Sequence, residues 1–176
     1  GLKGLCGIPA LRGRIIRPLL SCSRAEIEEY CFKNGINYVT DSTNLEDEYV
    51  RNKIRIHVLP ILQEINGLAL NNISLASQRN RIDEEFLEDE CRRVAAEIKK
   101  ENPDGFIGGI LISRLKPIHA SLLVRFLKMS VKEECGIRLS QRAIDVLSYM
   151  INSEVGRADI GGGYTASVRK GRLYIE

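Results

Sequence analysis

The longest helical pattern in the sequence runs over residues 68–101, and it limits how the rest of the chain can fold. Four apolar residues recur along it at spacings of four, three and four, as expected for one buried helix face: Leu87, Cys91, Val94 and Ile98. The segment 102–105, Asn-Pro-Asp-Gly, ends the pattern. We therefore predict one long helix and place a domain boundary at its start, near Gly67.

The residues before this helix carry shorter patterns. Ser23 with Glu26 three residues later forms a capping box, in which each side chain satisfies a free backbone N–H of the other. Asn34-Gly35 ends the helix that starts there. We predict a short strand near Ile15, a helix over 23–34, a strand over 36–40 and a helix over 46–59, with Pro60 as a kink or a new helix start.

The residues after the long helix alternate between helical and extended patterns. We predict a strand or extended link over 106–112, a helix from Pro117 to about 134, a helix over 140–150 and a final hairpin over 164–175. The sequence thus indicates a mainly α protein with a small β component.

Composition excludes several classes of protein. No run of about eighteen apolar residues exists, and no basic-then-apolar leader opens the chain, so we expect neither a membrane span nor secretion. Five cysteines without a CxxC pair argue against a metal site and indicate reduced thiols in the cytosol. The net charge of +3 is too small to indicate nucleic-acid binding by itself. Because the chain opens at Gly1 and stops inside an expected strand, we expect it to be an internal piece of a longer protein.

Three features that suggest chemistry have simpler interpretations. The triple glycine at 161–163 is followed by a hairpin instead of a helix, so we predict a turn instead of a phosphate loop. His57 and His119 have no neighbouring nucleophile and are expected to be solvent-facing or satisfied in the core. The acidic residues of 83–90 lie on the long helix and are expected to form a solvated face.

The densest polar segment runs from Asp41-Ser42-Thr43-Asn44 to Arg51-Asn52-Lys53-Ile54-Arg55. On a helix, Arg51 and Arg55 project from one face, and two guanidinium groups on one face suit phosphate or a nucleotide backbone. An exposed helix with ordinary salt bridges to nearby carboxylates is the alternative.

Several blocks together resemble the tRNA(Ile)-lysidine synthetases, which are PP-loop ATP-pyrophosphatases. The blocks are Gly7-Ile8-Pro9, Arg12-Gly13, Ile15-Ile16-Arg17-Pro18-Leu19-Leu20, Asp41-Ser42-Thr43-Asn44, Arg51-Asn52-Lys53-Ile54-Arg55 and Leu59-Pro60. Their order and spacing carry the resemblance, which is specific over residues 1–66 and looser beyond them. The resemblance implies that 1–66 is the C-terminal part of an α/β nucleotide-binding domain and 67–176 a helical, tRNA-binding domain ending in a β-hairpin.

The resemblance also implies a reaction and its partners. Such enzymes use ATP with Mg²⁺ to adenylate the first-anticodon-position cytidine of a tRNA(Ile) with a CAU anticodon, and free lysine then displaces AMP. We expect a cytoplasmic protein with no membrane partner, in which the long helix could supply a homodimer seam. The family's Ser-Gly-Gly-x-Asp-Ser loop is absent here, so we expect no cofactor bound to this chain, no metal site and no turnover by the chain alone.

The family's Arg-Asn-x-x-Arg motif matches Arg51, Asn52 and Arg55, and we expect Arg55 to contact phosphate or the substrate nucleotide and to be the catalytic candidate. Asp41 and Asn44 either shape the preceding turn or contact substrate. Arg12 is a further substrate-contacting candidate, whereas Arg17 is expected to be structural. The candidates for contact with the tRNA backbone beyond this segment are Arg79, Arg81, Arg92, Arg93, Arg125 and Lys128.

Two other functions remain open. The chain could belong to another PP-loop tRNA-modifying enzyme, such as a thiolation enzyme, although those commonly use cysteine pairs. It could instead be a non-catalytic helical module that binds protein. Binding that weakens steeply with salt favours nucleic acid over protein as the partner.

Overall fold

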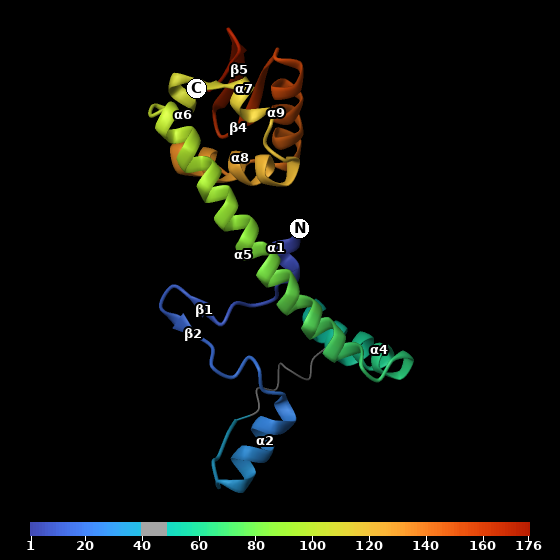
Figure 1. Cartoon of the computed structure of the whole chain (residues 1–176). Helices are drawn as coiled ribbons and strands as arrows, with labels where there is room; N and C mark the ends of the chain where they lie inside the picture. Colours follow the sequence, from blue (N-terminus) through green and yellow to red (C-terminus); the bar gives the residue numbers. More distant parts are fainter. Residues whose placement is uncertain (40–48) are drawn as a thin grey trace. The chain divides into compact units, whose positions relative to one another are not determined.

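A computed structural model describes residues 1–39 and 49–176 and divides them into two compact units, residues 1–84 and 85–176 (Figure 1). Asp41 and Asn44 lie outside the described residues. About 60% of the described residues are helical and the sheets among them are small and antiparallel, which confirms the mainly α expectation. The division falls within the long helix, and the domain boundary expected near Gly67 stays a prediction.

The first unit begins with helix α1 (Leu2–Leu5) and a two-stranded hairpin. Strands β1 (Leu11–Arg12) and β2 (Ile15–Ile16) pair antiparallel. Helix α2 (Arg24–Lys33) follows, and its capping box is present: the Ser23 hydroxyl accepts from the Glu26 N–H, and the Glu26 carboxylate accepts from the Ser23 N–H. These hydrogen bonds lower the pKa of Glu26. The strand expected over 36–40 is not formed by the described residues 36–39.

The helix expected over 46–59 is described only from residue 49 onward, where it is built from three consecutive pieces. Helix α3 (Val50–Lys53) leads into a π-helical turn, η2 (Ile54–Val58), and then into α4 (Leu59–Ile65). In a regular α-helix the Pro60 ring would clash with the carbonyl of Ile56, and the wider π turn relieves this conflict. The Leu59 N–H accordingly bonds to the Ile54 carbonyl. Pro60 therefore stands in the first turn of α4, one of the two positions expected for it.

Helix α5 (Ala69–Glu101) confirms the long helical pattern, and Asn102 to Gly105 end it as expected. Its second half belongs to the second unit. Short α6 (Gly105–Gly108), β3 (Ile110–Leu111) and α7 (Ile112–Leu115) follow, where the sequence indicated a single extended segment. Helix α8 (Ala120–Cys135) starts after His119, which caps it, so Pro117 lies outside the helix instead of in its first turn.

The second unit ends with helix α9 (Gln141–Ser153) and three strands. Ser140 caps α9 as expected. Strands β4 (Arg157–Gly161), β5 (Tyr164–Arg169) and β6 (Arg172–Ile175) form an antiparallel sheet with β3, in the order β3-β6-β5-β4. The expected hairpin is β5–β6, and β4 is an additional strand. The triple glycine forms the turn between β4 and β5, and Gly162 lies against Ile137, where a Cβ would come within 2.5 Å.

The hydrophobic core of the described residues lies in the second unit. One face of the sheet packs against α8, α9 and the end of α5, so that Phe106, Phe126, Leu127, Leu147 and Leu173 are almost fully buried. In Figure 1, α8 and α9 lie beside the red strands. By contrast, among the described residues of the first unit only Cys6 and Asn52 are buried. The second unit therefore has the core of an independently stable domain.

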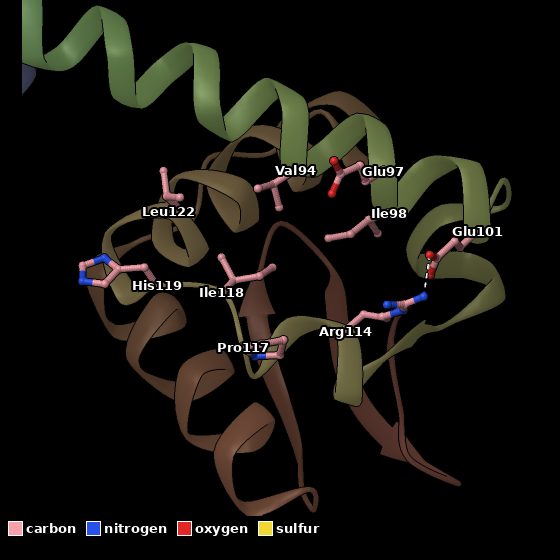
Figure 2. Close-up of a pocket in the computed structure, with 9 residues that line it drawn as sticks. All are labelled: Val94, Glu97, Ile98, Glu101, Arg114, Pro117, Ile118, His119 and Leu122. Carbon is pink, nitrogen blue, oxygen red and sulfur yellow. Dashed lines mark hydrogen bonds and ion pairs between the residues drawn. The ribbon is translucent and has the colours of Figure 1, made fainter.

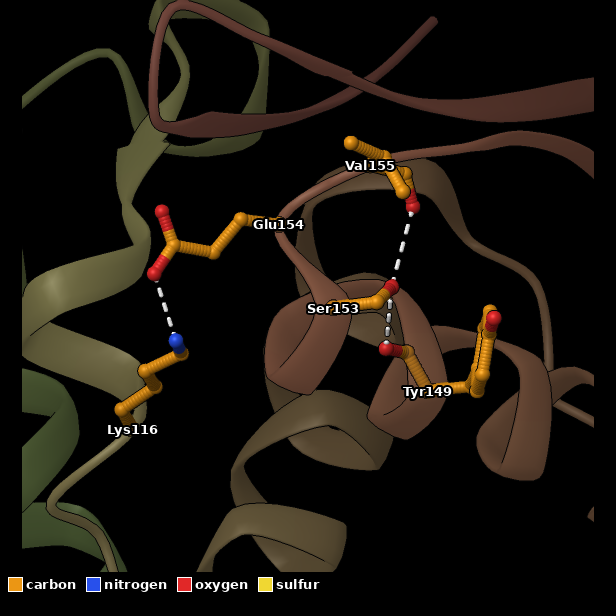
Figure 3. A network of polar contacts seen from close by, with 5 residues as sticks. All are labelled: Lys116, Tyr149, Ser153, Glu154 and Val155. Carbon is orange, nitrogen blue, oxygen red and sulfur yellow. Dashed lines mark hydrogen bonds and ion pairs between the residues drawn. The ribbon is translucent and has the colours of Figure 1, made fainter.

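A polar network fixes the end of α9 (Figure 3). Glu154 adopts a left-handed conformation at φ 58° and pairs with Lys116, at 2.5 Å between the ammonium and the carboxylate. The Ser153 hydroxyl donates to the Tyr149 carbonyl at 2.8 Å. Together these contacts tie the chain after α7 to the exit of α9.

Within the described part of the chain, no helix combines the length and apolar character needed to cross a membrane.

Candidate nucleic-acid interface

The Arg-Asn-x-x-Arg segment occupies α3 and the π turn. Asn52 is fully buried, and its N–H bonds to the Tyr49 carbonyl at 2.9 Å. Arg51 and Arg55 are exposed, and the Arg51 guanidinium lies 5.6 Å from the centre of the Tyr49 ring. The aromatic ring restricts the guanidinium without neutralising it. The segment thus presents two cations to solvent while the residue between them anchors the helix.

Arg55 lies inside the π turn, next to Ile54, whose carbonyl accepts the wide-turn hydrogen bond. Single π turns inside α-helices occur frequently at functional sites, because they change the direction in which side chains project. The sequence motif did not reveal this irregularity, although Pro60 is the residue that causes it. The π turn is an observation, independent of the motif, that draws attention to Arg55.

The candidates in the N-terminal hairpin differ in how they are held. Arg12 is exposed on β1. Arg17 donates from Nη1 to the Pro9 carbonyl at 3.1 Å, which fits the structural role expected for it. Of these two cations, Arg12 is the one that presents its charge to solvent.

Arg81 holds the first unit together. Its Nη2 donates to the Cys6 carbonyl at 2.7 Å and to the Ile8 carbonyl at 3.1 Å. Gly7 stands between them at φ 67°, a conformation that favours glycine, and a Cβ there would lie 3.2 Å from the Ser77 hydroxyl. We name this arrangement of Cys6, Gly7, Ile8 and Arg81 the Arg81 clasp. It gives Arg81 a structural role beside the tRNA contact expected from the sequence.

The remaining candidates on the long helix and beyond are solvent-facing to different degrees. Arg92 pairs with Asp89, and Arg93 pairs with Glu90 at 2.9 Å, both as exposed i,i+3 pairs. Such pairs contribute little to stability and can open to a phosphate. Arg79 is exposed, and no ion pair to it occurs within the described residues. Lys128 is exposed as well, whereas Arg125 is half-buried and donates to the Ser121 carbonyl.

A pocket of about 330 Å³ lies in the second unit, between the end of α5, α7 and the start of α8 (Figure 2). Val94, Ile98 and Leu122 give it apolar walls, and the Glu101–Arg114 ion pair at 2.6 Å lies at one side. His119 accepts from the Ser121 N–H as the cap of α8, so it has the satisfied role expected for it. The pocket lacks the paired nucleophile and base that catalysis by these residues would need.

Neither a glycine-rich phosphate loop nor a cluster of metal ligands occurs among the described residues. The only triple glycine connects two strands and does not precede a helix N-terminus, which a phosphate loop requires. No group of three or more potential metal ligands occurs in the described part of the chain.

All five cysteines are free thiols, in agreement with the reduced state expected for them. Cys91 and Cys135 are removed from solvent to different degrees, and burial raises the pKa of both thiols. Cys22 is exposed. Because the thiolate is the reactive form, burial should suppress the reactivity of Cys91.

We expect Cys22 to react with a thiol reagent such as DTNB within minutes at pH 8, and Cys91 to react only when the second unit unfolds. Timed labelling with mass spectrometry distinguishes the sites, and Cys22→Ser should remove the fast phase. Equal rates for both thiols would contradict the prediction.

The raised pKa of Cys91 also makes the stability of the second unit depend on pH. The folded state favours the neutral thiol, and this contribution to the free energy of unfolding is complete below about pH 8.5. It is lost as the pH rises through the folded-state pKa of Cys91.

Comparison with known families first shows which kind of domain the N-terminal residues resemble. Residues 1–62 match the family model described as a PP-loop domain. PP-loop domains are α/β nucleotide-binding folds, so the segment with the Arg-Asn-x-x-Arg motif is similar to a nucleotide-binding domain.

Three relatives that match 89–100% of the chain carry the same enzyme name. The tRNA(Ile)-lysidine synthase of Clostridioides difficile is 36% identical over 89% of this chain and 35% of its own length. The Caldanaerobacter subterraneus enzyme of the same name is 36% identical over 91% and 35%, and the Francisella tularensis subsp. novicida enzyme is 28% identical over 100% and 44%. The chain is thus related along its whole length to tRNA(Ile)-lysidine synthases, and it spans 35–44% of the length of these relatives.

Proposed function

We propose that the chain is part of an ATP-dependent ligase that attaches lysine to the first anticodon cytidine of tRNA(Ile). In this reaction the C2 oxygen of the cytidine attacks the α-phosphate of ATP and pyrophosphate leaves. The ε-amine of free lysine then bonds to C2, and the C2–O bond breaks with release of AMP. ATP with Mg²⁺ would be required by the whole enzyme, and we propose a cytoplasmic location.

We propose that this chain contributes tRNA recognition instead of the adenylation chemistry. The observation that carries the proposal is the exposed pair Arg51 and Arg55, held on a π-interrupted helix by the buried Asn52. Guanidinium groups bind phosphate in a bidentate manner and attract a polyanion. Arg12 and Arg79 are exposed cations of the same unit that could extend the contact. Residues 1–66 would then be the PP-loop part and 67–176 the tRNA-binding part.

Direct binding tests this proposal. We expect the 176-residue chain to bind an isoleucine tRNA transcript with a CAU anticodon more tightly than an elongator methionine tRNA. Both affinities should fall steeply between two salt concentrations. Absence of binding, or binding that does not change with salt, would contradict tRNA recognition by this chain. Salt-insensitive binding to a protein instead would favour the helical-module alternative.

Variants of the Arg-Asn-x-x-Arg segment locate the contact. We expect Arg55→Gln to weaken binding to the isoleucine tRNA roughly tenfold at 0.1 M salt and to lower the salt slope by about one, because one phosphate contact is lost. Lys53→Gln is the matched control, since it removes one exposed cation from the same helix. Equal effects of the two variants would contradict a specific phosphate contact by Arg55, because the loss of one positive charge from this helix would then explain the weaker binding.

A further inference from the structure

The sheet of the second unit has one face that does not contribute to the core. In an antiparallel sheet, directly opposed residues project from the same face. Arg169 opposes Arg172, Ser167 opposes Tyr174, and Arg157 opposes Ser167. The alternate residues Ala166, Val168, Leu173 and Ile175 pack in or against the core. We call the side with Arg157, Ser167, Arg169, Arg172 and Tyr174 the outer sheet face.

The outer sheet face has an aromatic residue that orients one of its cations. The Arg169 guanidinium lies over the Tyr174 ring, 4.6 Å from its centre. The ring packs against Gly109, where a Cβ would come within 2.5 Å, so it cannot shift toward β3. Arg169 also donates from Nε to the Ser167 hydroxyl at 3.1 Å and pairs with Glu176. Tyr174 and Ser167 are therefore positioning residues for Arg169.

Lys170 extends the same charge at the tip of the β5–β6 hairpin. Lys170 and Gly171 have φ values of 50° and 69°, as in a type I′ turn. This turn favours Asn-Gly, so a lysine at its first central position is held in a conformation that β-carbon-bearing residues rarely adopt. The side chain is exposed, and within residues 1–39 and 49–176 no carboxylate pairs with it.

The cations of the outer sheet face divide into those that the fold uses and those that it leaves available. Arg172 donates to the Gly109 carbonyl at 2.7 Å and to the Asn102 side chain, and so supports the fold. Arg157 is exposed, and the described residues contain no ion-pair partner for it. Together with Lys170 at the hairpin tip, the three arginines of this face outnumber its two carboxylates, Asp159 and Glu176. Arg157 and Lys170 therefore carry charge that the folded unit does not need.

We propose that the outer sheet face binds the phosphodiester backbone of RNA, with Arg157 and Lys170 as direct contacts and Arg169 as an oriented third one. This inference rests on the proposed function, because it takes the tRNA as the polyanion. Arg157 is aligned with Ser167, three residues before Lys170, so the two cations lie roughly 10 Å apart along the strand direction. Cations distributed along the strand direction suit the phosphates of an RNA backbone, which Lys and Arg neutralise without regard to base sequence.

The test compares two double variants of the 176-residue chain. Arg157→Gln/Lys170→Asn removes the two available cations, and asparagine is the preferred residue at the turn position, so the variant should melt no lower than the wild type. Arg138→Gln/Arg142→Gln is the control, because it removes two exposed cations from the same unit that lie outside the sheet. The readout is fluorescence anisotropy of a labelled isoleucine tRNA transcript across a salt series.

We expect the sheet variant to lower the slope of log affinity against log salt by about two and to weaken binding more than tenfold at 0.1 M salt, with the control close to wild type. Wild-type affinity and slope in the sheet variant would overturn the inference and leave the proposed function standing. Equal losses in both double variants would also overturn it, because net charge alone would then explain binding. A wild-type chain that shows no salt-dependent tRNA binding would overturn the proposed function and this inference together.

Discussion

Replacing Phe106 with alanine is expected to lower the free energy of unfolding of the second unit by about 3–5 kcal/mol. The Phe106 side chain is 0% exposed, and its ring centre lies 6.2 Å from that of Phe126. The Phe106 N–H donates to the Glu134 carboxylate at 2.8 Å, which would hold α6 in place after the substitution. The cavity would therefore collapse only partly, and the loss should approach the upper end of the range.

Urea denaturation followed by far-UV circular dichroism measures this loss. Ile107→Ala is the matched control, since its side chain is the next in the same short helix and is 74% exposed. It should change the free energy of unfolding by no more than about 0.5 kcal/mol. If the two variants unfold at the same urea concentration, Phe106 does not have the buried role described.

Replacing Arg81 with alanine is expected to destabilise the first unit locally by about 1.5–3 kcal/mol, because two carbonyls lose a charged donor. The Arg81 clasp joins residues 75 positions apart in the chain, so its loss should release the segment around Cys6. Hydrogen exchange with mass spectrometry should show peptides covering residues 2–9 exchanging roughly ten- to a hundredfold faster.

Arg79→Ala controls for charge in this experiment, because Arg79 lies on the same helix and is exposed. It should leave exchange in residues 2–9 unchanged. Unchanged exchange in Arg81→Ala as well would mean that the clasp does not hold the N-terminal segment.

Local sequence signals predicted the elements whose stability is local. Ser23 with Glu26, Ser140 and the Lys170-Gly171 turn each act within a few residues, and each lies where the sequence placed it. Strand β4 was not predicted, because in Arg-Ala-Asp-Ile-Gly only Ile160 has high β-propensity. Backbone pairing with β5 stabilises this strand although most of its own residues have low β-propensity.

The candidate interface was predictable only in part, for a similar reason. The Arg51 and Arg55 positions followed from a local motif, and both are exposed as a contact surface requires. The clasp of Arg81 could not be predicted, because its partners are backbone carbonyls that a sequence pattern does not distinguish. The outer sheet face was likewise hidden, since the register that aligns Arg157 with Ser167 depends on the unpredicted strand β4.

The π turn at Ile54–Val58 also restricts how this segment can change in length. A π turn contains one residue more than an α turn but completes the same single revolution, so deleting one residue from it would leave Asn52 and Arg51 facing as they do now. The α turn that results would bring the Pro60 ring against the carbonyl four residues before it. Deletions, which surface loops tolerate, should therefore be disfavoured within this turn as long as Pro60 is present.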